Sequence, residues 1–134
     1  MPQFRISEVA GLLGVSDDTV RRWVDAGTLR ATTDDTGRLV VDGVDAAHRA
    51  VELAEAAADP SGVGRSARNR FVGLVTRVQR DGVMAQVDIQ AGPHRVVSLV
   101  SAEAVDELGL APGSLAVAVV KATSVIVETP QGAR

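Results

Sequence analysis

The sequence predicts an α+β chain in which a small winged helix-turn-helix domain precedes a five-stranded, OB-like β-barrel. Three observations support this prediction. Residues 6–25 show helical spacing broken by a short turn, and residues 71–129 alternate apolar and polar side chains. Between these two patterns lies a segment rich in Pro, Gly and Ser, and 134 residues are enough for two such small domains.

Two short helices joined by a tight turn are expected near the N-terminus. Apolar residues follow helical spacing over residues 6–13, with Ser7 as a candidate cap, and Ser16 is a favourable N-cap for a second helix that Gly27 ends. The inner stripe of this second helix consists of Val20, Trp23 and Val24. Two such helices make a helix-turn-helix unit.

A β-wing and a third helix complete the first predicted domain, which we place at residues 1–59. Residues 29–33 and 38–41 flank the turn sequence DDTG, which is typical of a hairpin. Asp42 is expected to cap an alanine-rich third helix that continues nearly to the end of the domain.

The second domain is expected at residues 66–130, after a linker at residues 60–65. Asp81-Gly82 is a strong hairpin signal between its first two strands. The predicted strands are two within residues 71–90 and one each at residues 94–101, 114–122 and 124–129. With one short helix capped by Ser101, this set predicts a closed or nearly closed barrel. A unit of this size buries a modest share of its surface alone, so self-association is expected.

Composition argues against several kinds of site. The chain has no cysteine, which excludes disulfides and thiolate metal sites and makes a cytoplasmic location the default. His48 and His94 lack nearby carboxylate patterning and are expected to be ordinary side chains rather than metal ligands. Since no Gly-rich phosphate loop precedes a helix either, an enzyme is not expected. No apolar run approaches the length of a membrane span.

Charge is distributed unevenly along the chain. Residues 1–60 carry six arginines and eleven acidic side chains, a net charge of −5, whereas residues 61–134 carry a net charge of +2. Backbone affinity for DNA comes from neutralising phosphates. DNA binding by the first domain therefore requires a local arrangement of arginines, and more than one copy in the complex.

Four sequence motifs in the first domain occur together in one known superfamily. They are EVAGLLGVS, DTVRRW, AGTL and TGRLVVDGVD, and over residues 5–50 the chain resembles the winged helix-turn-helix of MerR and excisionase proteins. The resemblance implies binding to double-stranded operator DNA, with the second helix in the major groove and arginines on phosphates. The implied DNA contacts are Ser16, Asp18, Thr19, Arg21, Arg22, Arg30 and Arg38.

Other roles are open for parts of this first domain. Arg22 is also placed to pair with Asp18 four residues earlier, and Trp23 is expected in the core rather than in DNA. The acidic charge also permits a domain that binds proteins instead. The long dimerising coiled coil of MerR regulators is absent, so dimerisation is expected from the second domain.

Five motifs in the second domain match another family in order. They are SARNRF, GLVTRV, DGVMAQVDI, VVSLVSAEAVDELGLAPG and AVVKATSVIV, and over residues 65–129 the chain resembles the Mop domain of the TOBE group. This resemblance implies binding of molybdate or tungstate at interfaces between subunits of a dimer or hexamer. A tetrahedral dianion of this kind needs several converging hydrogen-bond donors and one or two cations.

Three separate segments supply the oxyanion-binding residues that the resemblance implies. They are Ser66, Ala67, Arg68 and Asn69; Ser98, Leu99, Val100 and Ser101; and Lys121, Ala122 and Thr123. The same residues have simpler readings as a basic linker, a helix cap and a solvated lysine. Arg65 and Arg70 add positive potential, and whether they touch the ligand is left open.

The expected function is a molybdate- or tungstate-responsive DNA-binding transcriptional regulator without an organic cofactor. In this role the anion would bind two arrangements of the oligomer unequally. One alternative is intracellular storage or buffering of molybdate, with the helix-turn-helix as an accessory arm. Another is an architectural DNA-binding protein that senses no anion.

Overall fold

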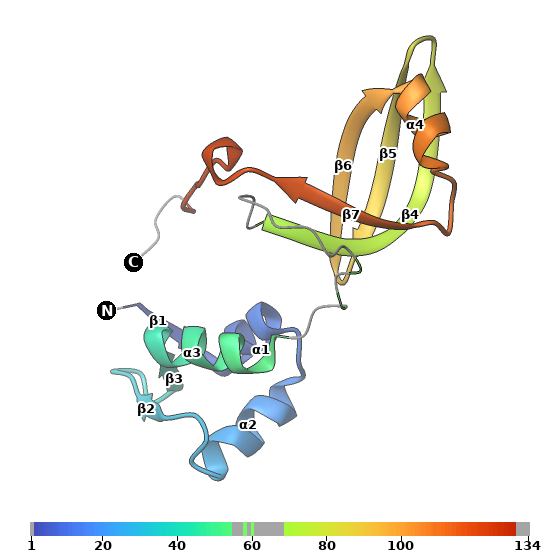
Figure 1. The fold of residues 1–134 in the computed structure, drawn as a ribbon. Helices are drawn as coiled ribbons and strands as arrows, with labels where there is room; N and C mark the ends of the chain where they lie inside the picture. The colour runs from blue at the N-terminus through green and yellow to red at the C-terminus, as the bar shows by residue number, and fades with distance from the viewer. Residues whose placement is uncertain (1, 55–57, 59, 61–68, 131–134) are drawn as a thin grey trace. The chain divides into compact units, whose positions relative to one another are not determined.

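A computed structural model describes residues 2–54, 58, 60 and 69–130, which fall into two compact units (Figure 1). Each unit is considered by itself. No helix in the described ranges is long and apolar enough to cross a membrane.

The first unit contains three helices and a small antiparallel sheet. Its elements are β1 (Gln3–Arg5), α1 (Ile6–Leu13), α2 (Asp17–Asp25), β2 (Ala31–Thr33), β3 (Leu39–Asp42) and α3 (Gly43–Leu53). The strand order is β1-β3-β2, so the predicted wing gains a third strand at the N-terminus. This strand was not predicted because three residues are too few to show alternation.

Of the three predicted helix N-caps in this unit, two are confirmed. Ser16 Oγ accepts a hydrogen bond from the Thr19 amide at 3.1 Å, and Asp42 Oδ1 accepts one from the Val44 amide at 2.8 Å. The prediction of Ser7 as a cap was wrong. The N-cap is Arg5, two residues earlier, and Glu8 Oε1 accepts its amide at 2.9 Å. The third helix also ends earlier than predicted, because Ala54 takes an extended conformation.

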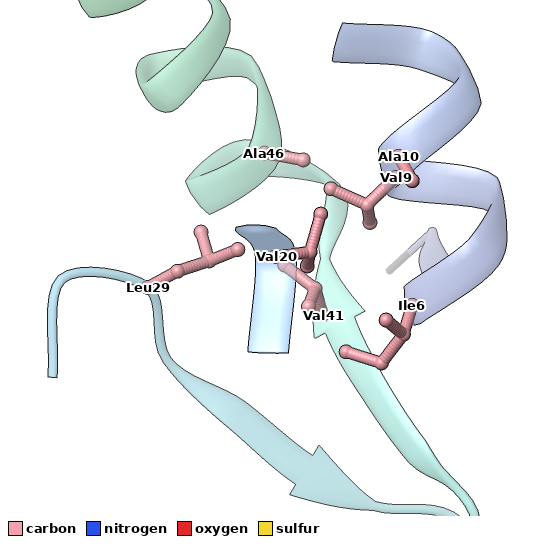
Figure 2. Packing of buried hydrophobic residues seen from close by; sticks show 7 residues of the cluster. All are labelled: Ile6, Val9, Ala10, Val20, Leu29, Val41 and Ala46. Atoms are coloured by element: carbon pink, nitrogen blue, oxygen red, sulfur yellow. The ribbon is translucent and has the colours of Figure 1, made fainter. Parts of the chain in front are cut away.

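One apolar cluster holds these elements together (Figure 2). Its buried members are Ile6, Val9, Ala10, Val20, Leu29, Val41 and Ala46, which come from both helices of the helix-turn-helix, the wing and α3. Trp23 and Val24 pack against it from the inner side of α2, as the helical spacing predicts. Burial of this stripe fixes which side of α2 is left exposed.

The second unit is a curled four-stranded antiparallel sheet with one helix (Figure 1). Its elements are β4 (Asn69–Asp81), β5 (Met84–Ala91), β6 (His94–Ser101), α4 (Ala102–Leu108), β7 (Leu115–Val120) and the 3₁₀ turn η1 (Ala122–Ser124). The strand order is β6-β5-β4-β7. Gly82, at φ 62°, starts the predicted hairpin turn, and Val105 of α4 enters a core with Val75 and Val87.

The prediction of a fifth strand at residues 124–129 was wrong for the single chain. Among the described residues no strand follows β7, and the chain turns through η1 instead. Val125, Ile126 and Val127 are 47 %, 85 % and 84 % exposed, so their apolar side chains find no place in the core of their own chain. The sheet consequently keeps two edges, β6 and β7, and is not a closed barrel within one chain.

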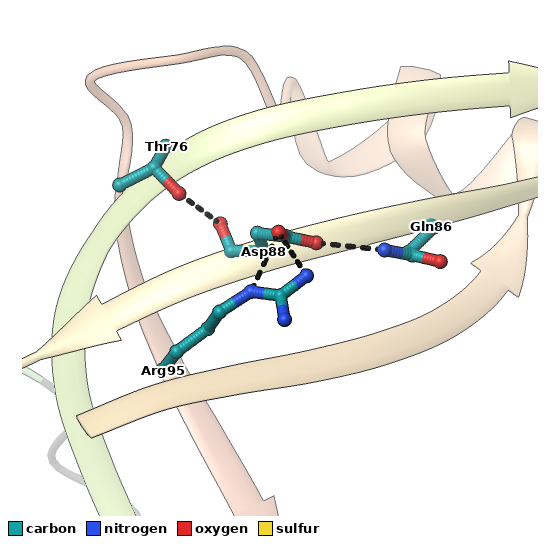
Figure 3. Close-up of polar contacts among 4 residues, drawn as sticks. All are labelled: Thr76, Gln86, Asp88 and Arg95. Atoms are coloured by element: carbon teal, nitrogen blue, oxygen red, sulfur yellow. Dashed lines mark hydrogen bonds and ion pairs between the residues drawn. The ribbon is translucent and has the colours of Figure 1, made fainter.

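A polar cluster fixes the pairing of β5 with β6 (Figure 3). Asp88 is only 5 % exposed, and its Oδ2 accepts hydrogen bonds from Arg95 Nη2 at 2.7 Å and Nε at 2.9 Å. Its Oδ1 accepts one from Gln86 Nε2 at 3.1 Å, and the backbone carbonyl accepts a longer one from Thr76 Oγ1. A buried carboxylate is tolerated only with such partners. The Gln86 amide, and then Arg95, hold the pKa of Asp88 below its usual range.

The close approach of β4 to β5 leads to a test of the second unit. A Cβ at Gly73 would lie 2.3 Å from the Gln90 carbonyl oxygen, which is backbone and cannot move aside. Gly73→Ala should therefore lower the free energy of unfolding of this unit by about 1–3 kcal/mol. Far-UV circular dichroism in urea would record the loss. The fluorescence of Trp23, the only tryptophan, reports the first unit and should not change.

Gly11 on α1 offers a matched control for that substitution. No atom lies within 4 Å of a Cβ built there, and its backbone is helical. Gly11→Ala should raise the stability of the first unit by up to about 1 kcal/mol. Equal stability of Gly73→Ala and the wild-type chain would contradict the proposed steric constraint.

The Asp88 cluster predicts how stability depends on pH. Because the pKa of Asp88 is lower in the folded chain than in the unfolded chain, its contribution is present at neutral pH. That contribution is lost as the pH falls below the unfolded value of about 3.9 toward the folded value. Urea denaturation from about pH 5 downward should show a steeper loss for the wild-type chain than for Asp88→Asn. Parallel curves would show that the carboxylate is not stabilised by its partners.

Candidate DNA-binding surface and oxyanion site

The start of α2 presents a chain of hydroxyl groups linked to an arginine. Ser16 Oγ lies 3.0 Å from Thr19 Oγ1, which accepts a hydrogen bond from Arg22 Nη2 at 3.0 Å. The alternative of an Arg22–Asp18 ion pair is not found among the described residues. Ser16 and Asp18 are exposed and Thr19 is half-buried. The hydrogen bonds among Ser16, Thr19 and Arg22 orient these side chains at the N-terminal end of α2, the end that would enter the major groove.

The structure divides the four predicted DNA-contacting arginines into two pairs. Arg22 donates to Thr19, and Arg30 Nη2 lies 3.3 Å from Asp45 Oδ1. By contrast, Arg21 and Arg38 have no side-chain partner within the part of the chain that the structure describes. Both are exposed, and both line a shallow depression of about 370 Å³ beside α2 and the wing.

The wing turn that precedes Arg38 is held by one carboxylate. Asp34 Oδ1 accepts hydrogen bonds from the Thr36 hydroxyl at 2.7 Å, the Thr36 amide at 2.9 Å and the Arg38 amide at 3.0 Å. These donors, the Thr36 hydroxyl first, lower the pKa of Asp34. The backbone at Arg38 is thus fixed while its side chain projects into solvent.

Trp23 is a structural residue, as its position in the inner stripe predicts. The guanidinium of Arg49 lies over its ring, 4.4 Å from the ring centroid, and Arg49 Nη1 lies 3.9 Å from Glu52 Oε1. This cation–π contact connects α3 to α2. The Trp23 ring thus contacts Arg49 and the buried cluster, which supports its assignment to the core.

Two of the three predicted oxyanion segments meet at one end of the sheet. Asn69, the first residue of β4, pairs with Val120, the last residue of β7, and Asn69 Nδ2 donates to the Val120 carbonyl oxygen at 3.1 Å. Lys121 comes next and is the N-cap of η1, which contains Ala122 and Thr123. Ser66, Ala67 and Arg68 lie outside the described residues. Lys121, Ala122 and Thr123 therefore follow directly after the β7 residue that pairs with Asn69, and Thr123 is exposed.

The remaining segment lies on β6, at the other edge of the sheet. Ser101 stands opposite Met84 beside the β4–β5 turn, whereas Asn69 is at the far end of β4. Ser101 Oγ already accepts the Ala104 amide at 3.0 Å as the cap of α4, as predicted. Leu99 is 70 % exposed, and Ser98 and Val100 line a largely apolar groove between β6 and β7. Among the described residues, one chain therefore keeps Ser101 at the opposite end of the sheet from Asn69 and Lys121.

One residue of the candidate DNA surface was not predicted from the sequence. Arg5 lines the same depression as Arg21 and Arg38, and the pattern gave no signal for it because β1 was not expected. No cluster of His, Cys, Asp or Glu suited to a metal cation occurs in the described residues.

Both halves of the chain match known families. Residues 65–127 match the TOBE domain, and residues 4–45 match a helix-turn-helix domain. The chain is 38 % identical over 63 residues to molybdenum-pterin-binding protein 2 of Clostridium pasteurianum, covering 46 % of this chain and 93 % of that protein. It is 46 % identical over 63 residues to a probable molybdenum-pterin-binding protein of Haemophilus influenzae, covering 46 % and 91 % respectively.

A solved structure resembles the second unit in fold as well as in sequence. It is the cytoplasmic molybdate-binding protein ModG with molybdate bound, at 42 % identity and a TM-score of 0.51, with 54 % of this chain and 52 % of that chain covered. These relatives and the match at residues 65–127 agree on the same half of the chain. The chain therefore belongs to the TOBE-domain family and joins its TOBE domain to an N-terminal helix-turn-helix domain.

Proposed function

We propose that this protein is a transcriptional regulator that binds operator DNA and responds to molybdate or tungstate. The observation that carries the proposal is the presence, in one chain, of a helix-turn-helix domain and a TOBE domain similar to proteins named for binding molybdate or molybdenum-pterin. In this proposal residues 1–59 are the DNA-binding domain, of MerR or excisionase type. Residues 66–130 are the Mop domain, and the protein acts in the cytoplasm, like the cytoplasmic molybdate-binding protein ModG.

The oxyanion site is proposed to form between copies of the chain. Asn69, Lys121 and Thr123 supply an amide, a cation and a hydroxyl near one another, which suits a tetrahedral dianion. Segment 98–101 stands at the opposite edge of the sheet, so a second chain would bring its own copy to complete the site. Ser66, Ala67 and Arg68 belong to this proposed site on the strength of the sequence resemblance.

Self-association is supported by the apolar surface that one chain leaves exposed. Residues 125–127 are apolar and exposed, and a largely apolar groove of about 460 Å³ runs between β6 and β7. Apolar surface of this kind is typical of contact sites. A dimer or hexamer would bury it and would also place two or more helix-turn-helix domains in one complex. Several copies would multiply the number of arginine contacts with one DNA duplex.

Anion binding would act on DNA binding through the oligomer. An anion held between chains favours the arrangement in which its donors converge, and that arrangement sets the spacing of the DNA-binding domains. Arg21 and Arg38, whose guanidinium groups form no hydrogen bond or ion pair in the described part of the chain, would then contact DNA phosphates. Storage of molybdate is the alternative that the similarity to molybdate-binding proteins also supports.

Anion-dependent DNA binding is the decisive test of the function. Duplexes selected from a random pool by the protein should be bound specifically, and molybdate should change their affinity by roughly 5- to 150-fold, the usual range of coupling between sites. Fluorescence anisotropy would measure affinity, with sulfate as the control anion and mass photometry recording the oligomer. Anion binding without specific DNA binding would favour storage. Specific binding that ignores molybdate would favour an architectural role.

Removal of the proposed cation tests the anion site. Lys121→Ala should weaken molybdate binding by about tenfold or more, because a charge-assisted hydrogen bond to the dianion is lost. The mass of the oligomer should stay the same, and Arg68→Ala is expected to behave alike. Isothermal titration calorimetry gives the affinity, with Arg77→Ala on the middle of β4 as a control of equal charge change. Unchanged affinity in both site variants would remove these residues from the site.

A further inference from the structure

Three arginines from different elements line the depression beside α2. Arg5 comes from the end of β1, Arg21 from the second turn of α2, and Arg38 from the residue before β3. Ser7, in the first turn of α1, and Asp17, in the first turn of α2, line it as well. The depression is open and its volume is about 370 Å³, which leaves room for one phosphate group with its water.

The fold brings these three arginines together in a defined way. Arg5 pairs with Val40 in the β1–β3 ladder, and Arg38 lies two residues before Val40. A residue and the diagonal neighbour of its partner are about 7–8 Å apart, within reach of long side chains. Ile6 and Val20 share the buried cluster, which holds the inner side of α2 against the start of α1.

The charge of this group is not neutralised by the protein. Within the described ranges, no carboxylate lies within ion-pair distance of Arg5, Arg21 or Arg38. Elsewhere in the same structure arginines do find carboxylates, as in Arg30–Asp45 at 3.3 Å and Arg80–Asp106 at 2.6 Å. Asp17 lines the depression, and Glu8 and Asp34 accept the backbone amides of Arg5 and Arg38, so these carboxylates offset part of the charge without forming an ion pair with the three guanidinium groups.

The geometry points to a site for a single phosphate of the DNA backbone, with Arg5 as a contact alongside Arg21 and Arg38. This inference rests on the proposed DNA binding and goes beyond it by naming one shared phosphate and an additional arginine. Guanidinium groups offer planar pairs of N–H donors that match phosphate oxygens. The backbone N–H groups in the first turn of α1, at Ser7, add the positive end of a helix dipole. A phosphate held from three elements would fix the register of α2 and the wing on the duplex together.

Charge-neutral methylphosphonate linkages test the assignment. A duplex bound by the wild-type chain is rebuilt with one such linkage at each position in turn. Its affinity is measured for the wild-type chain and for Arg5→Ala, Arg21→Ala and Arg38→Ala. The wild-type chain should lose on the order of tenfold in affinity at one position in each half-site. Each variant should be weaker on the unmodified duplex and less sensitive than the wild-type chain at that same position, because one of the three contacts with the phosphate is gone.

The salt dependence gives a second, independent measurement. If Arg5 and Arg21 share a phosphate, the double variant should lower the slope of log affinity against log salt by about 0.9 rather than about 1.8. Asp17→Asn should strengthen binding, because it removes a negative charge beside the phosphate. Arg77→Ala, in the second unit, removes the same charge as the other arginine variants and should leave the methylphosphonate profile unchanged. Trp23 fluorescence would confirm that each first-unit variant is folded.

The outcomes separate this inference from the proposed function. If the wild-type chain binds duplex DNA but Arg5→Ala keeps its affinity and profile, the shared site is overturned while DNA binding stands. Three variants that lose sensitivity at three different phosphates would overturn it as well. Competition by inorganic phosphate well beyond that by sulfate at equal ionic strength would indicate a free-anion site instead. Absence of duplex binding by the wild-type chain would overturn both.

Discussion

The second unit is constrained above all by a sheet that one chain leaves open. Its two edge strands, β6 and β7, are separated by two central strands, and residues 125–127 project apolar side chains into solvent. Edge strands with unpaired backbone groups and exposed apolar segments are normally covered. The proposed placement of the anion site between chains follows from the same openness, since its donors lie at both edges. Oligomer geometry and ligand binding are thus two aspects of one structural property.

In the first unit, some arginine side chains contact carboxylates or an aromatic ring, whereas others have no such contact among the described residues. Arg30 and Arg49 are committed to Asp45 and to Trp23 with Glu52, and they stabilise the domain. Arg5, Arg21 and Arg38 line the depression that is proposed to hold a phosphate. Asp34 and Asp42 keep their negative charge while they accept backbone N–H groups in the wing turn and at the start of α3. Any affinity of this acidic domain for a polyanion therefore depends on the local grouping of Arg5, Arg21 and Arg38.

The parts of the fold that were predictable from the sequence are those set by local chemistry. Ser16, Asp42 and Ser101 cap helices as expected, and Gly82 turns the first hairpin of the sheet. The elements that were not predicted correctly depend on pairing between segments that are far apart in the sequence. Strand β1 forms because residues 3–5 pair with β3. Segment 124–129 has β-type alternation but pairs with no strand among the residues that the structure describes. The same limit applies to the sites. Residue types suggested Lys121 and Arg21, whereas the grouping of Arg5 with Arg38 required the strand register.

If the exposed residues 125–127 are buried between chains as proposed, binding of the anion depends on the concentration of the protein. In the proposed arrangement each anion site needs donors from more than one chain. Dilution of the protein would dissociate the oligomer and so remove the complete site, even when the anion is present. At low copy number the chains would hold incomplete sites and single DNA-binding domains. As the copy number rises, complete sites and paired domains would appear together. The signal read at the operator would then combine two concentrations, that of the anion and that of the protein itself.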